Sequence, residues 1–284
     1  MTLFNKVYVS YTWFYTVKKI KNRIIYIPCE ELKAKQRYFL NAIKWVYPYK
    51  TDTLISAKIH AGKKWILKMD IKDFYNSVPY NQIQNVINRV CQRLNQNENA
   101  LFYLLLVTLD GKLPTGAPTS AHIANACLKP LDNEILRICS LYGIDYTRYV
   151  DDLTFSAYSK EALNTIEQRV KAILKQNNYE VNHKKTKYIS SNKQQNILGL
   201  VVNDYKVRLP KDFKRTIRAM LHGYVIRNLD YLPTDSKYLA VCSENQLVGY
   251  ISYVKHVDYA YYKKLKIYSK KLQQKYFVDI PFFK

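Results

Sequence analysis

Two adjacent carboxylates, Asp151 and Asp152, stand out because the residues around them are apolar and aromatic. The segment 146–150 leads into the pair and Leu153-Thr154-Phe155 follows it, which is the pattern of a tight β-hairpin with negative charge at its tip. Carboxylate oxygens are the ligands that hard divalent cations prefer. The pattern therefore predicts a divalent metal site at this tip.

A third carboxylate, Asp70, ends the apolar run of residues 65–69. Neighbouring residues of a strand point to opposite faces, so a turn must direct at least one of Asp151 and Asp152 toward a carboxylate from elsewhere. Asp70 is the candidate for that partner. The alternative is a structural turn in which the two Asp side chains accept hydrogen bonds from local backbone amides.

Composition indicates a polyanionic partner. The chain has 284 residues and a net charge of +23, from 45 Lys and Arg against 22 Asp and Glu. The net charge is +8 over residues 1–50, +5 over 51–204 and +10 over 205–284, so the carboxylates lie in the least basic part and the flanks are expected to bind phosphates. The 27 Tyr residues offer surfaces for base stacking, although drift in an AT-rich genome explains most of that total.

Cysteine usage and hydropathy argue against a disulfide-stabilised, a zinc-binding or a membrane-spanning protein. The five cysteines include no Cys-x-x-Cys pair, which predicts neither a disulfide framework nor a zinc site and suits a reducing cytoplasm. The longest apolar run, residues 101–109, is too short to cross a bilayer, so we expect no membrane partner. The length suits one domain with subdomains and leaves no room for a separate nuclease.

Hydrophobic spacing predicts the elements that must position the carboxylates. The predicted helices span residues 30–47, 80–94, 99–109, 116–141 and 160–176, and the chain after Pro210 is mainly helical with a loop near 230–236. The predicted strands are two within 16–28 around the basic turn Lys18 to Arg23, one over 65–70, the hairpin at 151, and short strands within 179–202. Residues 48–64 are predicted to be irregular.

Five blocks in a fixed order resemble the palm of reverse transcriptases over residues 18 to 205. They are 70–75, 113–120 with the helix-like segment after it, 149–152, 181–186 and 197–203. Within that family the phrases at 23–28, 56–60, 146–149 and 153–156 are similar to bacterial retron-type reverse transcriptases. The order of helices and strands suits an α+β palm, and the resemblance implies a right-hand polymerase fold, with an antiparallel palm sheet backed by helices, fingers and a helical thumb. We expect fingers at 1–64, palm with inserted fingers helices at 65–205, and thumb at 206–284.

The resemblance implies an RNA-directed DNA polymerase, in which a 3′-hydroxyl attacks the α-phosphate of a deoxynucleotide. Two Mg²⁺ ions about 4 Å apart would activate the hydroxyl and neutralise the departing pyrophosphate. Asp70 and Asp151 are predicted to bridge the ions, Asp152 to be a secondary ligand, and the backbone carbonyl of Ile71 to complete the shell. Lys185 stands where the family keeps a lysine that protonates the pyrophosphate.

The same resemblance assigns a nucleotide site. Tyr75 would pack under the sugar and clash with a 2′-hydroxyl, and the guanidinium of Arg23 would bind the triphosphate as a planar fork. Gly116 would let the backbone approach the nucleotide closely, and Thr115 would hydrogen-bond the sugar where most members carry Gln. His60 has no carboxylate or cysteine at ligand spacing and is predicted to be structural.

The implied partners are a structured noncoding RNA that serves as template and primer, its DNA product, deoxynucleoside triphosphates and a separately encoded effector used against phage. Thr115 and the segment Leu198-Gly199 differ from the retron pattern and favour a second hypothesis, a non-retron defence reverse transcriptase that makes repetitive or untemplated DNA. A third hypothesis is a catalytically silent RNA-binding protein that keeps the fold.

Overall fold

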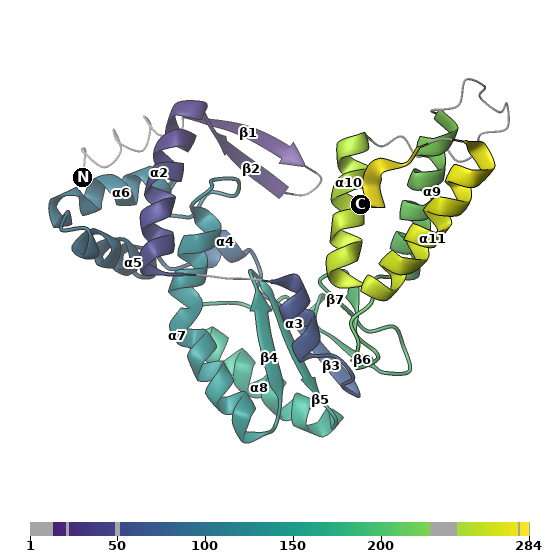
Figure 1. Ribbon diagram of the computed structural model, residues 1–284. Helices are drawn as coiled ribbons and strands as arrows, with labels where there is room; N and C mark the ends of the chain where they lie inside the picture. Colours follow the sequence, from purple (N-terminus) through teal and green to yellow (C-terminus); the bar gives the residue numbers. More distant parts are fainter. Residues whose placement is uncertain (1–13, 21–22, 49–51, 228–242, 278, 284) are drawn as a thin grey trace. The chain divides into compact units, whose positions relative to one another are not determined.

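The structure is a computed structural model that describes residues 14–20, 23–48, 52–227, 243–277 and 279–283. The chain forms two compact units (Figure 1). Unit 1 contains Met1–Asp52 and Lys64–Ile189, and unit 2 contains Thr53–Lys63 and Ser190–Lys284. The division into fingers, palm and thumb at residues 64 and 205 stays a prediction.

Unit 1 is a four-stranded sheet and a two-stranded hairpin with helices around them (Figure 1). Its strands are β1 (Tyr15–Ile20), β2 (Arg23–Pro28), β3 (Trp65–Asp70), β4 (Asp145–Tyr149), β5 (Asp152–Ala157) and β6 (Lys187–Ser190). Its helices are α2 (Glu30–Val46), α4 (Phe74–Ser77), α5 (Tyr80–Arg93), η1 (Asn97–Asn99), α6 (Ala100–Val107), α7 (Ser120–Leu141) and α8 (Lys160–Gln176).

The four-stranded sheet has the order β4-β5-β3-β6. Strand β5 pairs antiparallel with β4 and with β3, so the two segments that carry the acidic residues are neighbours in space. Five consecutive buried residues of β5, 153–157, make it a central strand, whereas β4 alternates between less buried and buried positions. The α+β expectation of an antiparallel sheet backed by helices is confirmed, since α8 packs on β3 and β5 and α7 packs on β4.

Helical spacing explains which faces of the helices are buried. In α8 the buried side chains are Leu163, Ile166, Val170, Ile173 and Leu174, three or four positions apart, and the Ser159 hydroxyl accepts a hydrogen bond from the Ala162 backbone N–H at its start. The helices predicted at 30–47, 80–94 and 160–176 are present within two residues of their predicted ends.

Unit 2 is mainly helical. Its elements are α3 (Thr53–Ile59), β7 (Asn196–Ile197), β8 (Leu200–Val201), α9 (Lys211–Arg227), α10 (Glu244–Val257), α11 (Tyr259–Tyr276) and η2 (Pro281–Phe283). Helix α3 corrects the prediction that residues 48–64 are irregular. Seven residues carry too little local signal, and α3 exists because Leu54 and Ala57 are buried where it packs on β8. The loop predicted near 230–236 lies outside the described residues, and none of the described helices is long and apolar enough to cross a membrane.

Asp258 joins two helices of unit 2 through its carboxylate. Its Oδ2 accepts an ion pair from Lys214 Nζ of α9 at 2.7 Å, and its Oδ1 accepts the Tyr261 N–H of α11 at 3.0 Å. Burial alone raises the pKa of Asp258, but these partners outweigh burial and hold the pKa below its ordinary value of 3.8. The ionised carboxylate therefore stabilises the folded unit.

We expect Asp258→Ala to cost about 2 kcal/mol of unfolding free energy at neutral pH, through loss of a helix cap and a charged hydrogen bond. Because the folded pKa is depressed, the wild-type advantage is fully present above the ordinary Asp value of 3.8 and is lost as the pH falls through the folded pKa. Thermal unfolding midpoints of both proteins at pH 7, 5 and 3 measure this. A difference that does not shrink in acid would contradict the assignment.

Candidate active site

The β4–β5 hairpin presents the acidic pair. Tyr149 pairs with Asp152, which leaves Val150 and Asp151 as the tip. Val150 has a left-handed φ of 58°, which is unfavourable for a β-branched residue and costs on the order of 1–3 kcal/mol. The turn therefore has to be held by contacts from outside itself.

Strand register brings Asp70 to the same place. Asp70 ends β3 directly opposite Asp152 on β5, and side chains of residues paired in this way share one face of the sheet. The N–H of Ile71 donates to the Asp151 carbonyl at 3.0 Å, which ties the end of β3 to the turn. Three carboxylates from two distant parts of the chain are thus neighbours, and Asp70 is only 5% exposed.

The loop after α8 adds a cation. Lys185 Nζ lies 2.7 Å from Asp70 Oδ1, and its side chain remains 49% exposed. Asn182 donates from Nδ2 to Asp70 Oδ2 at 3.2 Å and from its backbone N–H to the Asp70 carbonyl at 2.7 Å. The structure therefore brings Lys185 to the carboxylates, whereas its neighbour Lys184 is exposed.

Electrostatics at the turn favour a bound cation. Burial raises the pKa of Asp151, and the charges of Asp70 and Asp152 raise it further, against lowering by its own backbone N–H and by Lys185. Ionised carboxylates in this arrangement repel one another. Across the described residues, no three His, Cys, Asp or Glu side chains already converge as a ligand set.

Tyr75 lies beside the acidic turn. It belongs to α4, a single turn that follows β3, and its ring lies 5.3 Å from that of Phe74. Burial raises the pKa of Tyr75, and the charges of Asp151 and Tyr149 raise it further.

The loop of Thr115 and Gly116 packs against β2. The Thr115 carbonyl accepts the Tyr26 N–H at 2.8 Å. Gly116 has φ +115°, and a Cβ there would lie 2.7 Å from the Tyr26 carbonyl oxygen, so only glycine fits. Arg23 opens β2, but its side chain lies outside what the structure describes.

Three residues singled out in the sequence belong to unit 2. Leu198 and Gly199 both have positive φ and form the two-residue turn between β7 and β8, as a type I′ turn requires. His60 is fully buried.

A comparison with protein-family models decides the family. Residues 17–202 match the model described as reverse transcriptase (RNA-dependent DNA polymerase). The chain belongs to the reverse transcriptase family. The class of enzyme is therefore an RNA-directed DNA polymerase, and the resemblance seen in the five sequence blocks is confirmed.

The curated relatives of this reverse transcriptase include retron enzymes. It is 29% identical to the Retron Ec86 reverse transcriptase of Escherichia coli over 92% of this chain and 81% of the relative. It is 32% identical to the Retron Ec48 reverse transcriptase of the same species, over 61% of this chain and 43% of the relative. To the Retron Mx162 reverse transcriptase of Myxococcus xanthus it is 29% identical, over 76% and 52%. The chain thus spans most of one of these relatives and about half of the others.

Solved structures agree on the fold. Telomerase from Candida albicans, solved with a fragment of telomeric RNA, matches with a TM-score of 0.53 at 10% identity, over 99% of this chain and 69% of that chain. The corresponding telomerase from Candida tropicalis gives 0.51 at 11% identity, over 96% and 58%. At such identities the likeness concerns the fold alone, and it confirms the predicted polymerase fold.

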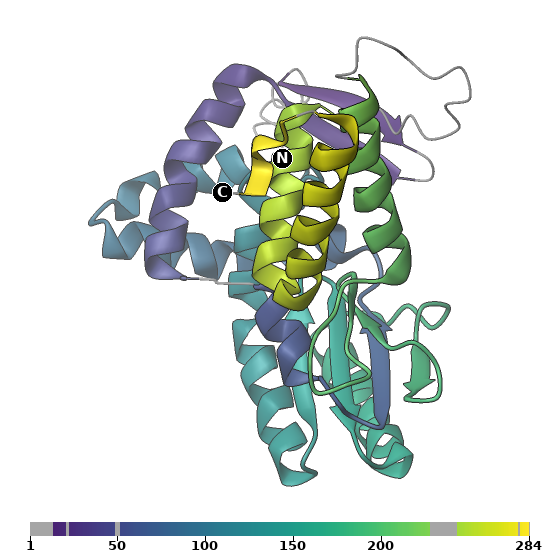
Figure 2. The same ribbon diagram turned by 45° about the vertical axis from the view of Figure 1, so that its right-hand side comes forward.

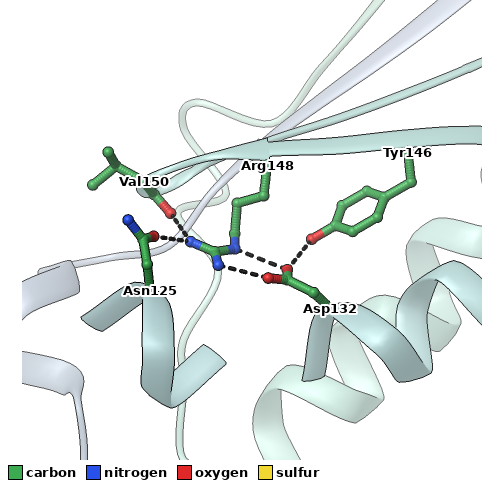
Figure 3. A network of polar contacts seen from close by, with 5 residues as sticks. All are labelled: Asn125, Asp132, Tyr146, Arg148 and Val150. Carbon is green, nitrogen blue, oxygen red and sulfur yellow. Dashed lines mark hydrogen bonds and ion pairs between the residues drawn. The ribbon is translucent and has the colours of Figure 1, made fainter. Parts of the chain in front are cut away.

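A buried arginine supports the acidic turn of this reverse transcriptase (Figure 3). Arg148 of β4 has a side chain only 2% exposed, and it donates from Nε and Nη2 to the two carboxylate oxygens of Asp132 at 2.8 and 2.6 Å. Its Nη1 donates to Asn125 Oδ1 at 2.6 Å and to the Val150 carbonyl at 2.8 Å. Tyr146 donates its hydroxyl to Asp132 Oδ1 at 2.8 Å. The network therefore fixes the left-handed residue before Asp151 to helix α7.

Sequence reasoning identified Arg148 only as part of a family phrase and did not identify its partners. Tyr146 and Arg148 occupy the buried positions of the alternating strand, and a buried charge requires a partner. That rule indicates that a carboxylate must face Arg148. It does not indicate which one, because Asp132 lies 16 residues away on α7. Asn182 lies in the block 181–186, and nothing local in the sequence indicates its contact with Asp70.

Proposed function

We propose that this chain is a retron-type RNA-directed DNA polymerase that copies a structured noncoding RNA into DNA by two-metal nucleotidyl transfer. The observation that carries the proposal is the pairing of Asp70 with Asp152 across β3 and β5, with Asp151 in the adjoining turn and Lys185 on Asp70. Two or three hard carboxylate oxygens suit magnesium, which keeps several waters and needs few protein ligands.

The residues present fit a pair of Mg²⁺ ions. Asp70 and Asp151 would hold both ions, Asp152 would be a secondary ligand, and the Ile71 carbonyl would complete the shell. Bound Mg²⁺ would activate the primer hydroxyl and neutralise the leaving pyrophosphate. Burial first, and then the charges of Asp70 and Asp152, raise the pKa of Asp151, and a bound cation would offset both effects on the ionised carboxylate.

Lys185 has a role at each stage of this proposal. Its ammonium lies 2.7 Å from Asp70 Oδ1, where it balances the charge of that carboxylate, and with half of its side chain exposed it would have room to move away from Asp70. Once free of Asp70, the ammonium would be the proton donor for the departing pyrophosphate. The proposed role explains why a partly exposed lysine, Lys185, lies against the buried carboxylate of Asp70.

The remaining nucleotide contacts are proposed from the resemblance to the family. Gly116 allows backbone approach, Thr115 would bond the sugar, and Arg23 would bind the triphosphate. Tyr75, beside Asp151, would exclude a 2′-hydroxyl by its bulk.

Tyr75→Ala is expected to raise ribonucleotide incorporation relative to deoxynucleotide incorporation on the order of 100-fold, because a shaped pocket discriminates a hydroxyl by about that factor. Single-nucleotide kcat/KM values for a matched ribonucleotide and deoxynucleotide measure it. Tyr75→Phe keeps the ring and serves as the control, with selectivity close to wild type. Equal selectivity in all three proteins would remove Tyr75 from the sugar site.

The function is tested with purified protein, a primed RNA template, magnesium and the four deoxynucleotides. We expect template-complementary DNA that EDTA abolishes and RNase pretreatment prevents. Absence of product, with nucleic acid still bound, would instead support the silent RNA-binding protein.

The nature of the product separates the two polymerase hypotheses. DNA that co-purifies with the protein is expected to be one defined single strand that matches a structured RNA. Tandem repeats or homopolymer would favour the non-retron alternative, which Thr115 in place of Gln motivates.

A role against phage, beside a separately encoded effector, belongs to the same proposal. Phage plating on cells that carry the native locus, with and without a substitution at Asp151, tests it. Equal plating would reject the defence role and leave the polymerase chemistry standing.

A further inference from the structure

Three adjoining hollows lie on one face of unit 1, with volumes of about 580, 690 and 290 Å³. They are formed by the end of α2, one face of α5, the middle of α7 and the segment after α8, and we call them together the α2–α5–α7 groove. Arg89 lines all three, and Arg93 lines two. None of the residues proposed above for metal or nucleotide lines the groove.

Helix α7 lies between this groove and the acidic hairpin. It contacts α5 on one side and β4 on the other, as Figures 1 and 2 both show. The groove is therefore a second surface of unit 1.

The charge of the groove is of one sign. Its charged residues are Arg89, Arg93 and Lys129, all of them exposed, and no Asp or Glu is among the described residues that line it. None of these three cations has a carboxylate partner within the described part of the chain. Two exposed guanidiniums one helical turn apart suit successive phosphate groups.

Aromatic and amide side chains complete the surface. Trp45 lines the groove with 66% of its surface exposed, and Arg89 lies 6.0 Å over the ring of Tyr47. The polar positions are filled by amides, including Asn85, Asn88, Gln92, Asn97 and Asn133. Amides donate and accept hydrogen bonds at base edges, and an exposed indole is a stacking platform for a base.

We propose that the α2–α5–α7 groove binds a single-stranded segment of nucleic acid away from the polymerase site. The arginines bind phosphates, Trp45 stacks on a base, and the amides contact base edges. Base edges and faces enter such hollows only from an unpaired strand, because a duplex keeps its bases stacked inside.

The test measures binding by fluorescence anisotropy in EDTA, so that no nucleotide is turned over and a failure of the polymerase proposal does not affect it. The probes are a labelled single-stranded RNA, a DNA of the same sequence and an RNA duplex. Arg89→Gln with Arg93→Gln is expected to weaken single-strand binding at least tenfold. It should also reduce the slope of log affinity against log salt by about 1.4, because two phosphate contacts are lost.

Trp45→Ala gives an independent arm, since its exposed side chain contributes little to the core. It is expected to weaken binding about tenfold, because loss of one stacked base has that effect. Crosslinking of a 4-thiouridine RNA should label peptides that contain Trp45 or residues 80–93. The RNA and DNA arms show which strand the groove prefers.

The control is Arg137→Gln with Arg169→Gln, which removes the same charge from exposed positions on α7 and α8 outside the groove. Unfolding midpoints establish that all variants are folded. An equal loss of single-strand affinity in both double variants would mean that net charge alone explains the effect, and would overturn the proposal. So would unchanged binding, an equal loss of duplex binding in the groove variant, or a change in oligomeric state of the groove variants alone.

Discussion

Asp151→Asn is expected to lower the rate of nucleotide incorporation by about 1,000-fold or more. The amide has nearly the same shape but carries no charge, so it cannot balance a divalent cation. Metal-based stabilisation of the transition state contributes several kcal/mol, and each 1.36 kcal/mol is a factor of ten in rate. Single-turnover incorporation on a primed RNA template measures the effect.

Stability distinguishes a chemical loss from an unfolded variant. The raised pKa of Asp151 means that its ionised form is unfavourable in the folded protein without metal, so the amide is expected to leave the unfolding midpoint unchanged or raise it. Wild-type protein should also gain thermal stability from Mg²⁺, because a ligand that binds only the folded state stabilises it. Asp151→Asn should lose most of that gain.

Asp110→Asn is the matched control for this substitution. Asp110 is exposed at the turn before Gly111 with a φ of 51°, a conformation that Asn adopts readily, so the same chemical change is expected to leave incorporation intact. Comparable loss in the two variants would contradict the role of Asp151. An active Asp151→Asn protein would overturn the metal site altogether.

Local patterns predicted those parts of the site that depend on local order. The hairpin at Asp151, the strand that ends at Asp70 and the spacing of α8 follow from alternation, helical periodicity and turn residues. The pairing of Asp70 with Asp152 does not follow from local patterns, because packing sets the register between strands that lie some 80 residues apart in the chain. The resemblance to a family supplied that juxtaposition, and the structure supplied its geometry.

The parts that could not be predicted depend on distant partners. Helix α3 is a short segment whose buried residues pack on β8, more than 140 residues later in the chain. The partners of Arg148 on α7 likewise follow from how a helix lies on a strand, which no spacing in the strand encodes. Helix α3 and the contacts of Arg148 with α7 are therefore determined by tertiary packing and not by local sequence.

Arg148→Met is expected to cost about 3–5 kcal/mol of unfolding free energy, because removing one partner of a buried ion pair leaves the other uncompensated. Asp132 would keep only the Tyr146 hydroxyl, and the Val150 carbonyl and Asn125 would lose their donor. Urea unfolding measures the loss. Arg137→Met, at an exposed position of α7, is the control and should change stability by no more than about 0.5 kcal/mol.

A compensated variant separates stability from positioning of the turn. Replacing Arg148 by Met, Asp132 by Leu and Tyr146 by Phe removes both charges of the ion pair and the hydroxyl bonded to it, and leaves Asn125 and the Val150 carbonyl without their donor. Exchanges of a buried ion pair for apolar side chains are often close to neutral in stability. The Val150 carbonyl still lacks its donor, so the strained residue before Asp151 is no longer held. We expect stability to return while the rate of incorporation and the apparent affinity for Mg²⁺ stay low. If the incorporation rate and the Mg²⁺ affinity recover together with stability, Arg148 supports only the fold of unit 1. If stability alone recovers, the hydrogen bond from Arg148 to the Val150 carbonyl is what places Asp151.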